Sequence, residues 1–204
     1  MSHSVCPWWI GWLLVSPLRR LWQDPRAIVG PYLRPGMTVL EPGPGMGFFT
    51  LDLARLVGPE GRVVAVDVEP RMLEALRRRS ARAGLLARID TRLSRGTSLG
   101  IDDVCGTCDF VLAFAVVHEL PDRAAFFAEA ARAIKPTGRL LLAEPRGHVS
   151  DGEFSATLVA AERAGFRPES RPAIRGSRAV LLAPSADRLA SEGSGRASRE
   201  PTEA

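Results

Sequence analysis

The chain has 204 residues, of which 46% are apolar and 25% are charged. These proportions are those of an ordinary globular domain, and they exclude a wholly disordered chain and a membrane protein with many spans. The net charge of +4 is spread along the chain rather than gathered between aromatic residues, so we expect no nucleic-acid partner.

A Trp-rich segment, residues 1–22, opens the chain and holds all four tryptophans. Its apolar run from Trp8 to Val15 is far shorter than the ~20 residues that cross a bilayer. No basic stretch precedes this run and no small-residue cleavage site follows it, which argues against a signal peptide. We therefore treat the segment as separate from the domain that follows.

Short apolar runs beyond this segment predict strands. Most of them are continuous rather than alternating, which is typical of strands buried on both faces of a sheet. The predicted strands cover residues 38–41, 63–67, 89–93, 110–115, 139–143, 167–174 and 178–183.

Helical patterns separate the strands, at residues 48–57, 70–83 and 122–134. Ser150 and Glu153 form a capping-box pattern that opens a further helix. Alternating strands and helices predict an α/β fold, a doubly wound parallel sheet with helices on both faces.

We assign this domain to residues 23–184. Residues 185–204 contain one large apolar side chain, Leu189, so we expect a disordered tail.

A glycine-rich loop follows the first predicted strand. Gly43, Gly45 and Gly47 stand between that strand and a helix, where a tight turn exposes N–H groups to a ligand. The next strand ends in Asp67, where a carboxylate can accept both hydroxyls of a ribose. A nicotinamide or flavin fingerprint would need a third glycine at Phe48, which disfavours a dinucleotide oxidoreductase.

Four stretches together resemble the class I, Rossmann-like, S-adenosylmethionine-dependent methyltransferases, in particular the ubiquinone/menaquinone-biosynthesis-like group. The resemblance spans about residues 34–183 and implies a seven-stranded, mostly parallel sheet whose last strand is antiparallel. The matching stretches are residues 41–47 (EPGPGMG), 63–73 (VVAVDVEPRML), 108–122 (CDFVLAFAVVHELPD) and 133–145 (AIKPTGRLLLAEP).

The resemblance implies that the cofactor is S-adenosyl-L-methionine. Glu41 would hold its amino group, Asp67 would accept the ribose hydroxyls, and Val68 would pack on adenine. Further cofactor contacts are implied for the loop glycines and the end of the fourth strand: Gly43, Gly45, Gly47, Ala113 and Phe114.

One departure concerns adenine. The family often has a Gly-Asp-Ala-like triplet where this chain has Ser94, Arg95 and Gly96. Arg95 cannot accept a hydrogen bond from the adenine amino group, so Ser98, Asp102 or a backbone carbonyl would have to replace the usual acid.

His118 is the candidate catalytic base, because its ordinary pKa is near neutrality and it follows the fourth strand. Alternatively, His118 orders the loop, and Glu119 either holds His118 or pairs with an arginine. Glu144, Arg146 and His148 follow the fifth strand and are candidates for binding the acceptor; alternatively Glu144 pairs with an arginine and the other two are solvated.

Cysteine spacing suggests a metal site only weakly. Cys105 and Cys108 form one pair, and His3 with Cys6 forms another at the far N-terminus. Because these pairs need not meet, we expect no metal.

The sequence thus predicts a cytoplasmic methyltransferase with a small-molecule acceptor. The Trp-rich segment is interpreted first as a lid, which favours an apolar or aromatic acceptor, second as a packing helix, and third as a peripheral membrane contact. The alternative functions are a cofactor-binding protein without turnover and an RNA methyltransferase. No oligomeric state is predicted.

Overall fold

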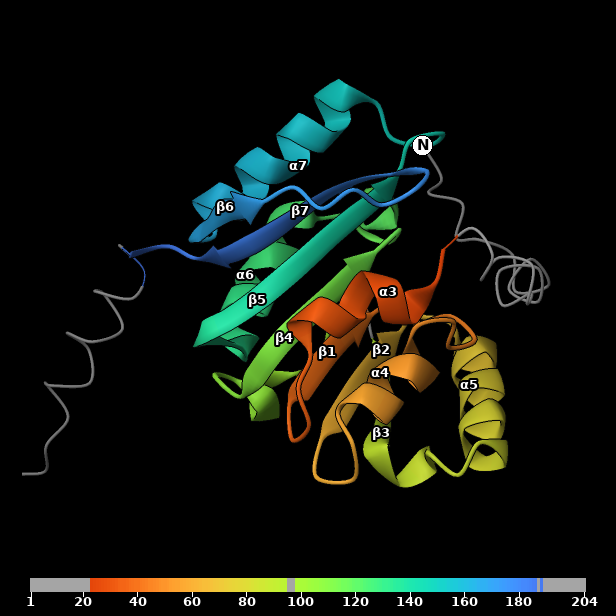
Figure 1. The fold of residues 1–204 in the computed structure, drawn as a ribbon. Coiled ribbons are helices and arrows are strands. Elements are labelled where there is room, and N and C mark those ends of the chain that lie inside the picture. Colours follow the sequence, from red (N-terminus) through yellow and green to blue (C-terminus); the bar gives the residue numbers. More distant parts are fainter. Residues whose placement is uncertain (1–22, 95–97, 187, 189–204) are drawn as a thin grey trace, which may run out of the picture.

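The computed structural model describes residues 23–94, 98–186 and 188 (Figure 1). The Trp-rich segment with its proposed lid role, Arg95 and Gly96, and the tail beyond Arg188 lie outside the described residues. Of the residues assigned to the tail, Ser185 donates its N–H to the carbonyl of Gly165 (2.8 Å), and Arg188 donates to the carbonyl of Ala131.

Seven strands form one sheet in the order β3-β2-β1-β4-β5-β7-β6. The strand β7 runs antiparallel to both its neighbours, and the pairs from β3 to β5 are parallel. The predicted doubly wound, mostly parallel sheet is therefore confirmed. The strands are β1 Thr38–Pro42, β2 Arg62–Asp67, β3 Ile89–Leu93, β4 Cys108–Phe114, β5 Ile134–Pro145, β6 Phe166–Ser170 and β7 Ser177–Pro184.

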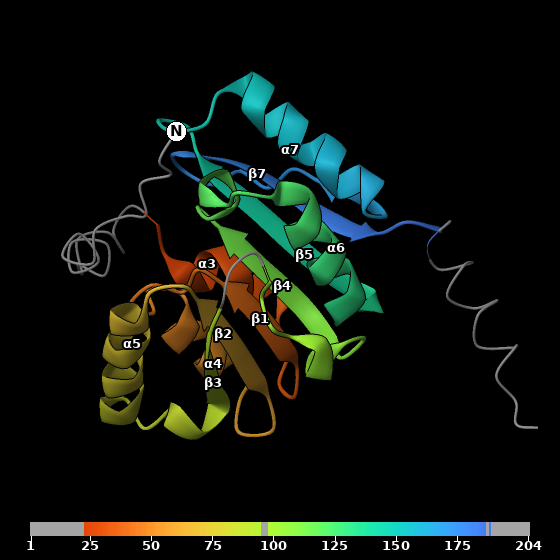
Figure 2. The same cartoon turned by 180° about the vertical axis from the view of Figure 1, so that it is seen from behind.

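Helices cover both faces of the sheet, with α3, α4 and α5 on one face and α6 and α7 on the other (Figures 1 and 2). Short 3-10 turns lie between them. The α-helices are α3 Pro25–Val29, α4 Thr50–Leu56, α5 Pro70–Arg82, α6 Arg123–Ala133 and α7 Asp151–Arg163; the turns are η1 Gly30–Tyr32, η2 Leu86–Arg88, η3 Asp102–Val104 and η4 Val117–Glu119.

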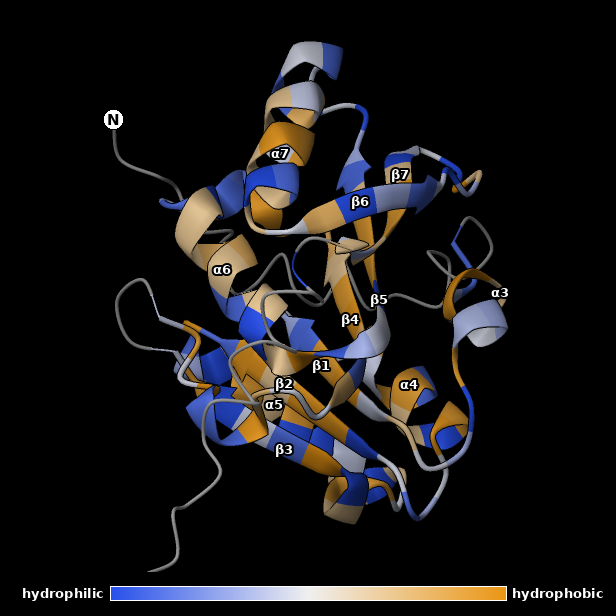
Figure 3. Cartoon of the chain, turned by 90° about the vertical axis from the view of Figure 1, so that its left-hand side faces the viewer, coloured by the Kyte–Doolittle hydropathy of each residue, from blue (hydrophilic) through white to orange (hydrophobic). Residues whose placement is uncertain are grey.

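The core consists of two apolar layers, one on each face of the central strands. Alternate residues of a strand enter opposite layers: Val39 and Val63 pack with α3 and α4, whereas Leu40 and Val64 lie in the layer that includes α6 and α7. The central strands are accordingly hydrophobic along their length (Figure 3). Burial on both faces explains why these strands appear in the sequence as continuous apolar runs.

Backbone constraints move several predicted boundaries. The helix predicted from residue 48 begins at Thr50, because a turn with Gly47 at φ +83° precedes it. The fourth strand ends at Phe114, since Ala115 has a left-handed φ of +54°. The fifth strand begins at Ile134, directly after α6, where it pairs with Cys108.

The last connection of the sheet is longer than predicted. The strand β6 ends at Ser170 rather than at residue 174, and residues 171–176 form an irregular link to β7. This link lies beside the end of β5, because Arg146 donates its N–H to the carbonyl of Gly176 (2.9 Å).

A buried carboxylate fastens α3 to the domain. Asp52 of α4 is fully buried, and its carboxylate accepts hydrogen bonds from Arg26 of α3 and Arg55 of α4, both at 3.1 Å. This contact holds α3, near the start of the described residues, against α4.

We expect Ser150→Ala to destabilise the protein by about 0.5–2 kcal/mol. Both capping-box bonds are present at this helix start, with the Ser150 hydroxyl accepting from the N–H of Glu153 and the Glu153 carboxylate accepting from the N–H of Ser150. Urea unfolding measures the change. The control, Ser155→Ala, removes an exposed hydroxyl that donates only to the carbonyl of Asp151 in the same helix, and alanine favours the helix, so its loss should be clearly smaller; equal losses for the two variants would contradict the capping role.

Candidate functional site

The strand order reverses between β1 and β4, and the site lies at the carboxyl ends of the strands on either side of this point. On one side follow β2 and β3, and on the other β5 and β7. A crevice opens at such a switch point in doubly wound folds, and ligands bind there. Four predicted site residues stand at or just before these strand ends: Glu41, Asp67, Phe114 and Glu144.

The three loop glycines serve different purposes. All have positive φ, but a Cβ at Gly43 would approach Val116 to 2.6 Å, and one at Gly47 would approach Leu76 to 2.4 Å. Packing within the protein therefore requires these two glycines. A Cβ at Gly45 would meet no atom of the described residues within 4 Å, so the main chain there faces space that a ligand can occupy.

Asp67 joins the glycine loop to the end of β2. Its carboxylate accepts the N–H of Gly45 (3.1 Å) and the N–H of Glu69 (3.0 Å). Burial raises the pKa of this carboxyl, while the backbone N–H groups oppose the rise. The next residue, Val68, is 51% exposed and presents an apolar surface beside the carboxylate.

Glu41 is a buried carboxyl with an unsatisfied oxygen. The residue is 3% exposed, and its Oε2 has no hydrogen-bond partner in the described part of the chain. Burial raises its pKa from the ordinary 4.5 to about 8; the Thr50 side chain opposes this rise and the charge of Asp67 adds to it. A cationic ligand group beside Glu41 would relieve this cost.

The end of β4 contributes a buried and a partly exposed residue. Ala113 is fully buried in the core. Phe114 is partly exposed, and its ring lies 4.4 Å from that of Phe49, which precedes α4. Of the two residues implied to approach the cofactor, only Phe114 has an accessible side chain.

His118, on η4, is held by Glu144 from the end of β5. Its Nδ1 lies 2.5 Å from Oε2 of Glu144, and Oε1 of Glu144 accepts the N–H groups of Val117 (2.9 Å) and His118 (3.3 Å). Glu144 is 1% exposed. Its hydrogen bond is the main cause of the raised pKa of His118, and burial works against it.

Two neighbours complete this cluster. Nε2 of His118 lies 3.9 Å from Oε1 of Glu119, and the rings of His118 and His148 are 6.1 Å apart. Burial raises the pKa of Glu119, and the charges of Glu144 and Asp67 raise it further. Because Val116, two residues before His118, lies against Gly43, this cluster and the glycine loop are neighbours.

The three candidate acceptor residues after β5 therefore have separate surroundings. Glu144 is buried and contacts His118 rather than an arginine. Arg146 is exposed and donates to the carbonyl of Ser177 (3.1 Å), whereas His148 is exposed beside His118.

The structure places two of the proposed substitutes for the adenine acid. Asp102 has an 89% exposed side chain, 3.8 Å from Arg132. The hydroxyl of Ser98 accepts the N–H of Gly100 (3.1 Å), and the carbonyl of Ser98 accepts the hydroxyl of Ser94 (2.6 Å). The hydroxyl of Ser98 also donates to the carboxylate of Glu129 in α6 (3.5 Å), so both polar groups of Ser98 have partners within the protein.

Sequence reasoning missed two residues that shape the glycine loop. Val116 packs on Gly43, and Arg79 of α5 donates to the carbonyl of Met46. Neither has a signal in the sequence: Val116 reads as one more apolar residue, and Arg79 is one of several arginines in its helix.

No metal cluster or membrane span is found in the described ranges. No group of three or more His, Cys, Asp or Glu residues there could hold a metal ion. Cys105 is exposed and Cys108 is buried, which raises the pKa of its thiol to about 11, while Cys6 and His3 lie outside the described residues. No helix in these ranges has the length and apolarity needed to cross a bilayer.

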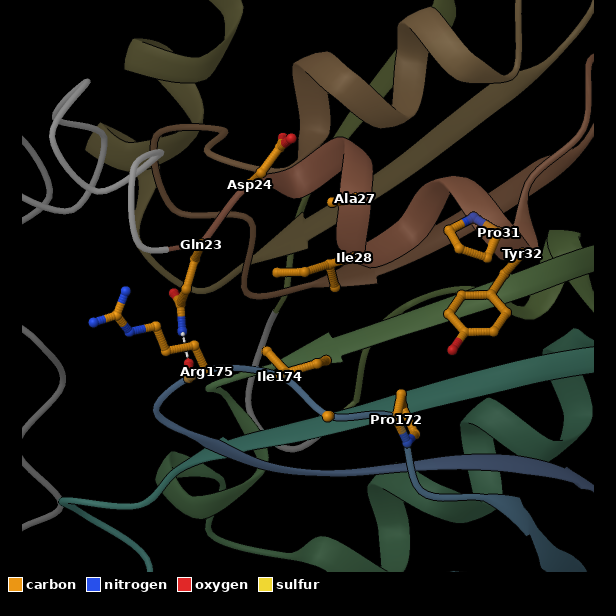
Figure 4. A pocket seen from close by; sticks show the side chains of 10 residues that line it. Gln23, Asp24, Ala27, Ile28, Pro31, Tyr32, Pro172, Ile174 and Arg175 are labelled. Atoms are coloured by element: carbon orange, nitrogen blue, oxygen red, sulfur yellow. Dashed lines mark hydrogen bonds between the residues drawn. The ribbon is translucent and has the colours of Figure 1, made fainter.

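A pocket of about 360 Å³ lies between α3–η1 and the link from β6 to β7 (Figure 4). Gln23 spans its edge by donating to the carbonyl of Arg175 (3.1 Å), and Tyr32 stacks on Phe110 at 5.7 Å. Ile174 and Tyr32 belong to the same apolar layer as Phe114. The lining residues are Gln23, Asp24, Ala27, Ile28, Pro31, Tyr32, Pro172, Ala173, Ile174 and Arg175.

Comparisons with known proteins agree with this geometry. The family model described as "Methyltransferase domain" matches residues 40–142. Similar curated proteins include the ubiquinone/menaquinone biosynthesis C-methyltransferase UbiE of Marinomonas sp. (30% identity; 65% of this chain, 51% of the relative). They also include the arsenite methyltransferase of Halobacterium salinarum (30% identity; 59% of this chain, 30% of the relative). A third is nocamycin O-methyltransferase of Saccharothrix syringae (34% identity; 55% of this chain, 39% of the relative).

A solved structure described as a SAM-dependent methyltransferase from Aquifex aeolicus superposes with a TM-score of 0.76 at 26% identity, covering 87% of this chain and 98% of that one. The chain spans about a third to a half of the length of the curated relatives just named.

The sheet order, the glycine loop and the acid at the end of β2 define a Rossmann-like domain of the class I, S-adenosylmethionine-dependent methyltransferase fold. Since the family model matches half of its residues, the chain belongs to the family of methyltransferase domains. The resemblance stated from the sequence is confirmed, and S-adenosylmethionine is the cofactor to which family and fold point.

We expect Glu41→Gln to stabilise the protein increasingly as the pH rises from about 4.5 to 8. In this window the folded wild type keeps a proton on Glu41 that the unfolded chain has released, so wild-type stability falls with pH. The gain should reach about 1–3 kcal/mol by the upper end. Urea unfolding across this pH range tests it, with Glu74→Gln at an exposed carboxyl as the control; a pH-independent difference would contradict the assignment.

Proposed function

We propose that this protein transfers a methyl group from S-adenosylmethionine to a small-molecule acceptor at the carboxyl edge of its sheet. The single observation that carries the proposal is the grouping of an unsatisfied buried carboxyl, an open glycine main chain and an acid at the next strand end. These are Glu41, Gly45 and Asp67.

Each part of this group fits one part of the cofactor. Oε2 of Glu41 has no hydrogen-bond partner among the residues that the structure describes, and it suits a cationic amino group, with or without a bridging water. The carboxylate of Asp67 already accepts two N–H groups and keeps lone pairs for ribose hydroxyls. Exposed Val68 offers an apolar surface to a flat base.

When bound, S-adenosylmethionine supplies an electrophilic methyl group on a sulfonium that leaves as a neutral thioether. The residues of this chain then align and exclude water, an effect that can supply roughly 7–11 kcal/mol of the barrier. Phe49 and Phe114 contribute apolar surface at the strand ends, and His118 is the candidate base for an acceptor that arrives protonated.

The acceptor is proposed to be apolar or aromatic. In support, the pocket of Figure 4 is lined mainly by Ile, Pro, Ala and Tyr side chains and lies on the sheet face that carries Phe114. The Trp-rich segment is proposed as its cover, because the described chain begins at Gln23, in the pocket wall. The relatives named above, judged by their printed names, also methylate small molecules.

A second candidate is a protein of this fold that binds the cofactor without methylating an acceptor. The fold alone does not fix the reaction: a solved [4+2]-cyclase, SpnF, superposes with a TM-score of 0.62 at 20% identity. The missing adenine acid motivates this alternative, because Asp102, one of its proposed substitutes, is exposed to solvent.

Calorimetric titration with S-adenosylmethionine, S-adenosylhomocysteine and NADH tests the cofactor assignment. We expect binding of the two sulfur ligands and none of NADH. NADH binding alone would refute the proposal. Binding of the sulfur ligands with no transfer of radiolabelled methyl to any of a panel of aromatic and apolar acceptors would favour the second candidate.

We expect Gly45→Asn to weaken S-adenosylhomocysteine binding by about tenfold or more, the equivalent of roughly 1.4 kcal/mol. Asparagine tolerates the positive φ at this position, so the fold survives while the side chain fills the open space. The matched control is Gly84→Asn, where φ is also positive and an added Cβ would meet no atom of the described residues within 4 Å. Equal affinities of both variants and wild type would show that the ligand does not approach Gly45.

A further inference from the structure

Two exposed apolar side chains flank Asp67, the acid that suits a ribose. Val68 follows it in the chain, and Leu93 is its partner in the parallel register of β2 and β3. These side chains are 51% and 45% exposed. Within the described ranges only two other large apolar side chains are exposed, Leu86 on η2 and Val159 on α7. The pair at Asp67 therefore offers an apolar surface to the base that a bound ribose would carry.

The loop after β3 offers no carboxylate to such a base. Residues 94–101 contain neither Asp nor Glu. The next acid in the chain, Asp102, has an 89% exposed side chain that lies 3.8 Å from Arg132. The acid after it, Asp103, accepts two hydrogen bonds from Arg92, at 2.6 and 2.7 Å. Both acids are thus turned toward arginines of the protein.

Two further carboxylates adjoin this loop, and they also have partners in the protein. Asp90 of β3 accepts a hydrogen bond from Arg92 (2.9 Å). Glu129 of α6 accepts the N–H of Leu99 (2.8 Å) and the hydroxyl of Ser98 (3.5 Å). Glu129 is buried, so its carboxylate holds the loop against α6.

Arg92 explains why Asp103 does not serve the base. Its side chain is 17% exposed, and it also donates to the carbonyl of Gly100 (3.3 Å), so it ties the end of the loop to β3. Successive side chains of a strand point to opposite faces of the sheet. Arg92 therefore holds Asp103 on the face opposite to that of Leu93.

We propose that this site holds the base of its cofactor by apolar contact with Val68 and Leu93 and does not read the amino group of adenine. It then accepts a nucleoside thioether or sulfonium whose purine lacks that group. The inference rests on the proposed function and specifies the class of ligand that its base end takes. The sequence resemblance implies the contact of Val68 with adenine; the indifference to the amino group is particular to this chain.

The strength of hydrogen bonds gives this proposal a measurable form. A hydrogen bond from a base to a buried carboxylate typically contributes a factor of roughly ten or more to affinity. An amino group that meets only water keeps the same partners in the free and the bound ligand, so its removal changes affinity little. Apolar contact with the rest of the purine is the same with and without the amino group.

The first test compares two ligands by calorimetry. One is S-adenosylhomocysteine, and the other is its analogue in which hydrogen replaces the amino group of adenine, so that the ring nitrogens are unchanged. We expect the two dissociation constants to agree within about threefold. A larger loss for the analogue, with S-adenosylhomocysteine itself bound, would overturn this inference alone. Failure of both ligands to bind would overturn the proposed function and this inference with it.

The second test asks whether apolar contact holds the base. We expect Leu93→Ala to weaken the binding of both ligands equally, by at least about threefold, because it removes surface that the purine covers. The matched control is Leu86→Ala, which removes an equally exposed leucine on η2 and should bind both ligands as wild type does. Thermal unfolding verifies that both variants are folded. Wild-type affinity in Leu93→Ala, or a loss for S-adenosylhomocysteine only, would contradict the proposal.

Discussion

Carboxyl groups gathered at one edge of the sheet are the constraint on which the proposed site depends. Parallel strands end together, so Glu41, Asp67 and Glu144 come to the same edge, and Glu119 follows nearby on η4. Burial raises the pKa values of Glu41, Asp67 and Glu119, because carboxylates there lose water and repel one another. These carboxyl groups therefore lower the stability of the unliganded protein, and a cationic ligand bound at this edge would recover part of the loss.

Glu144 is buried at the same edge but has hydrogen-bond donors of its own. Three hydrogen-bond donors from η4 surround it, including the ring of His118. The edge therefore contains two kinds of carboxyl. At Glu41, one carboxyl oxygen has no hydrogen-bond partner among the described residues, which suits a ligand. At Glu144, both carboxylate oxygens have hydrogen-bond partners on η4, which holds that turn in place.

The strands and the glycine loop were predictable from the sequence because their signals are local. Apolar runs located the sheet, and the spacing of Gly43, Gly45 and Gly47 after Glu41 located the loop. The bond between His118 and Glu144 was not predictable, since it depends on the register of β4 against β5, which places Phe114 opposite Ala143. Likewise, Val116 touches Gly43 only because β1 and β4 are neighbours in the sheet.

The contact between Val116 and Gly43 has an evolutionary consequence. A larger side chain at 116 would press on the glycine loop, and any side chain at 43 would press on the segment that leads to His118. The two positions can change only together, and each change would alter both halves of the site at once. Insertions and substitutions are therefore tolerated more readily along the irregular link between β6 and β7, which lines the pocket of Figure 4, because changes there leave this contact intact.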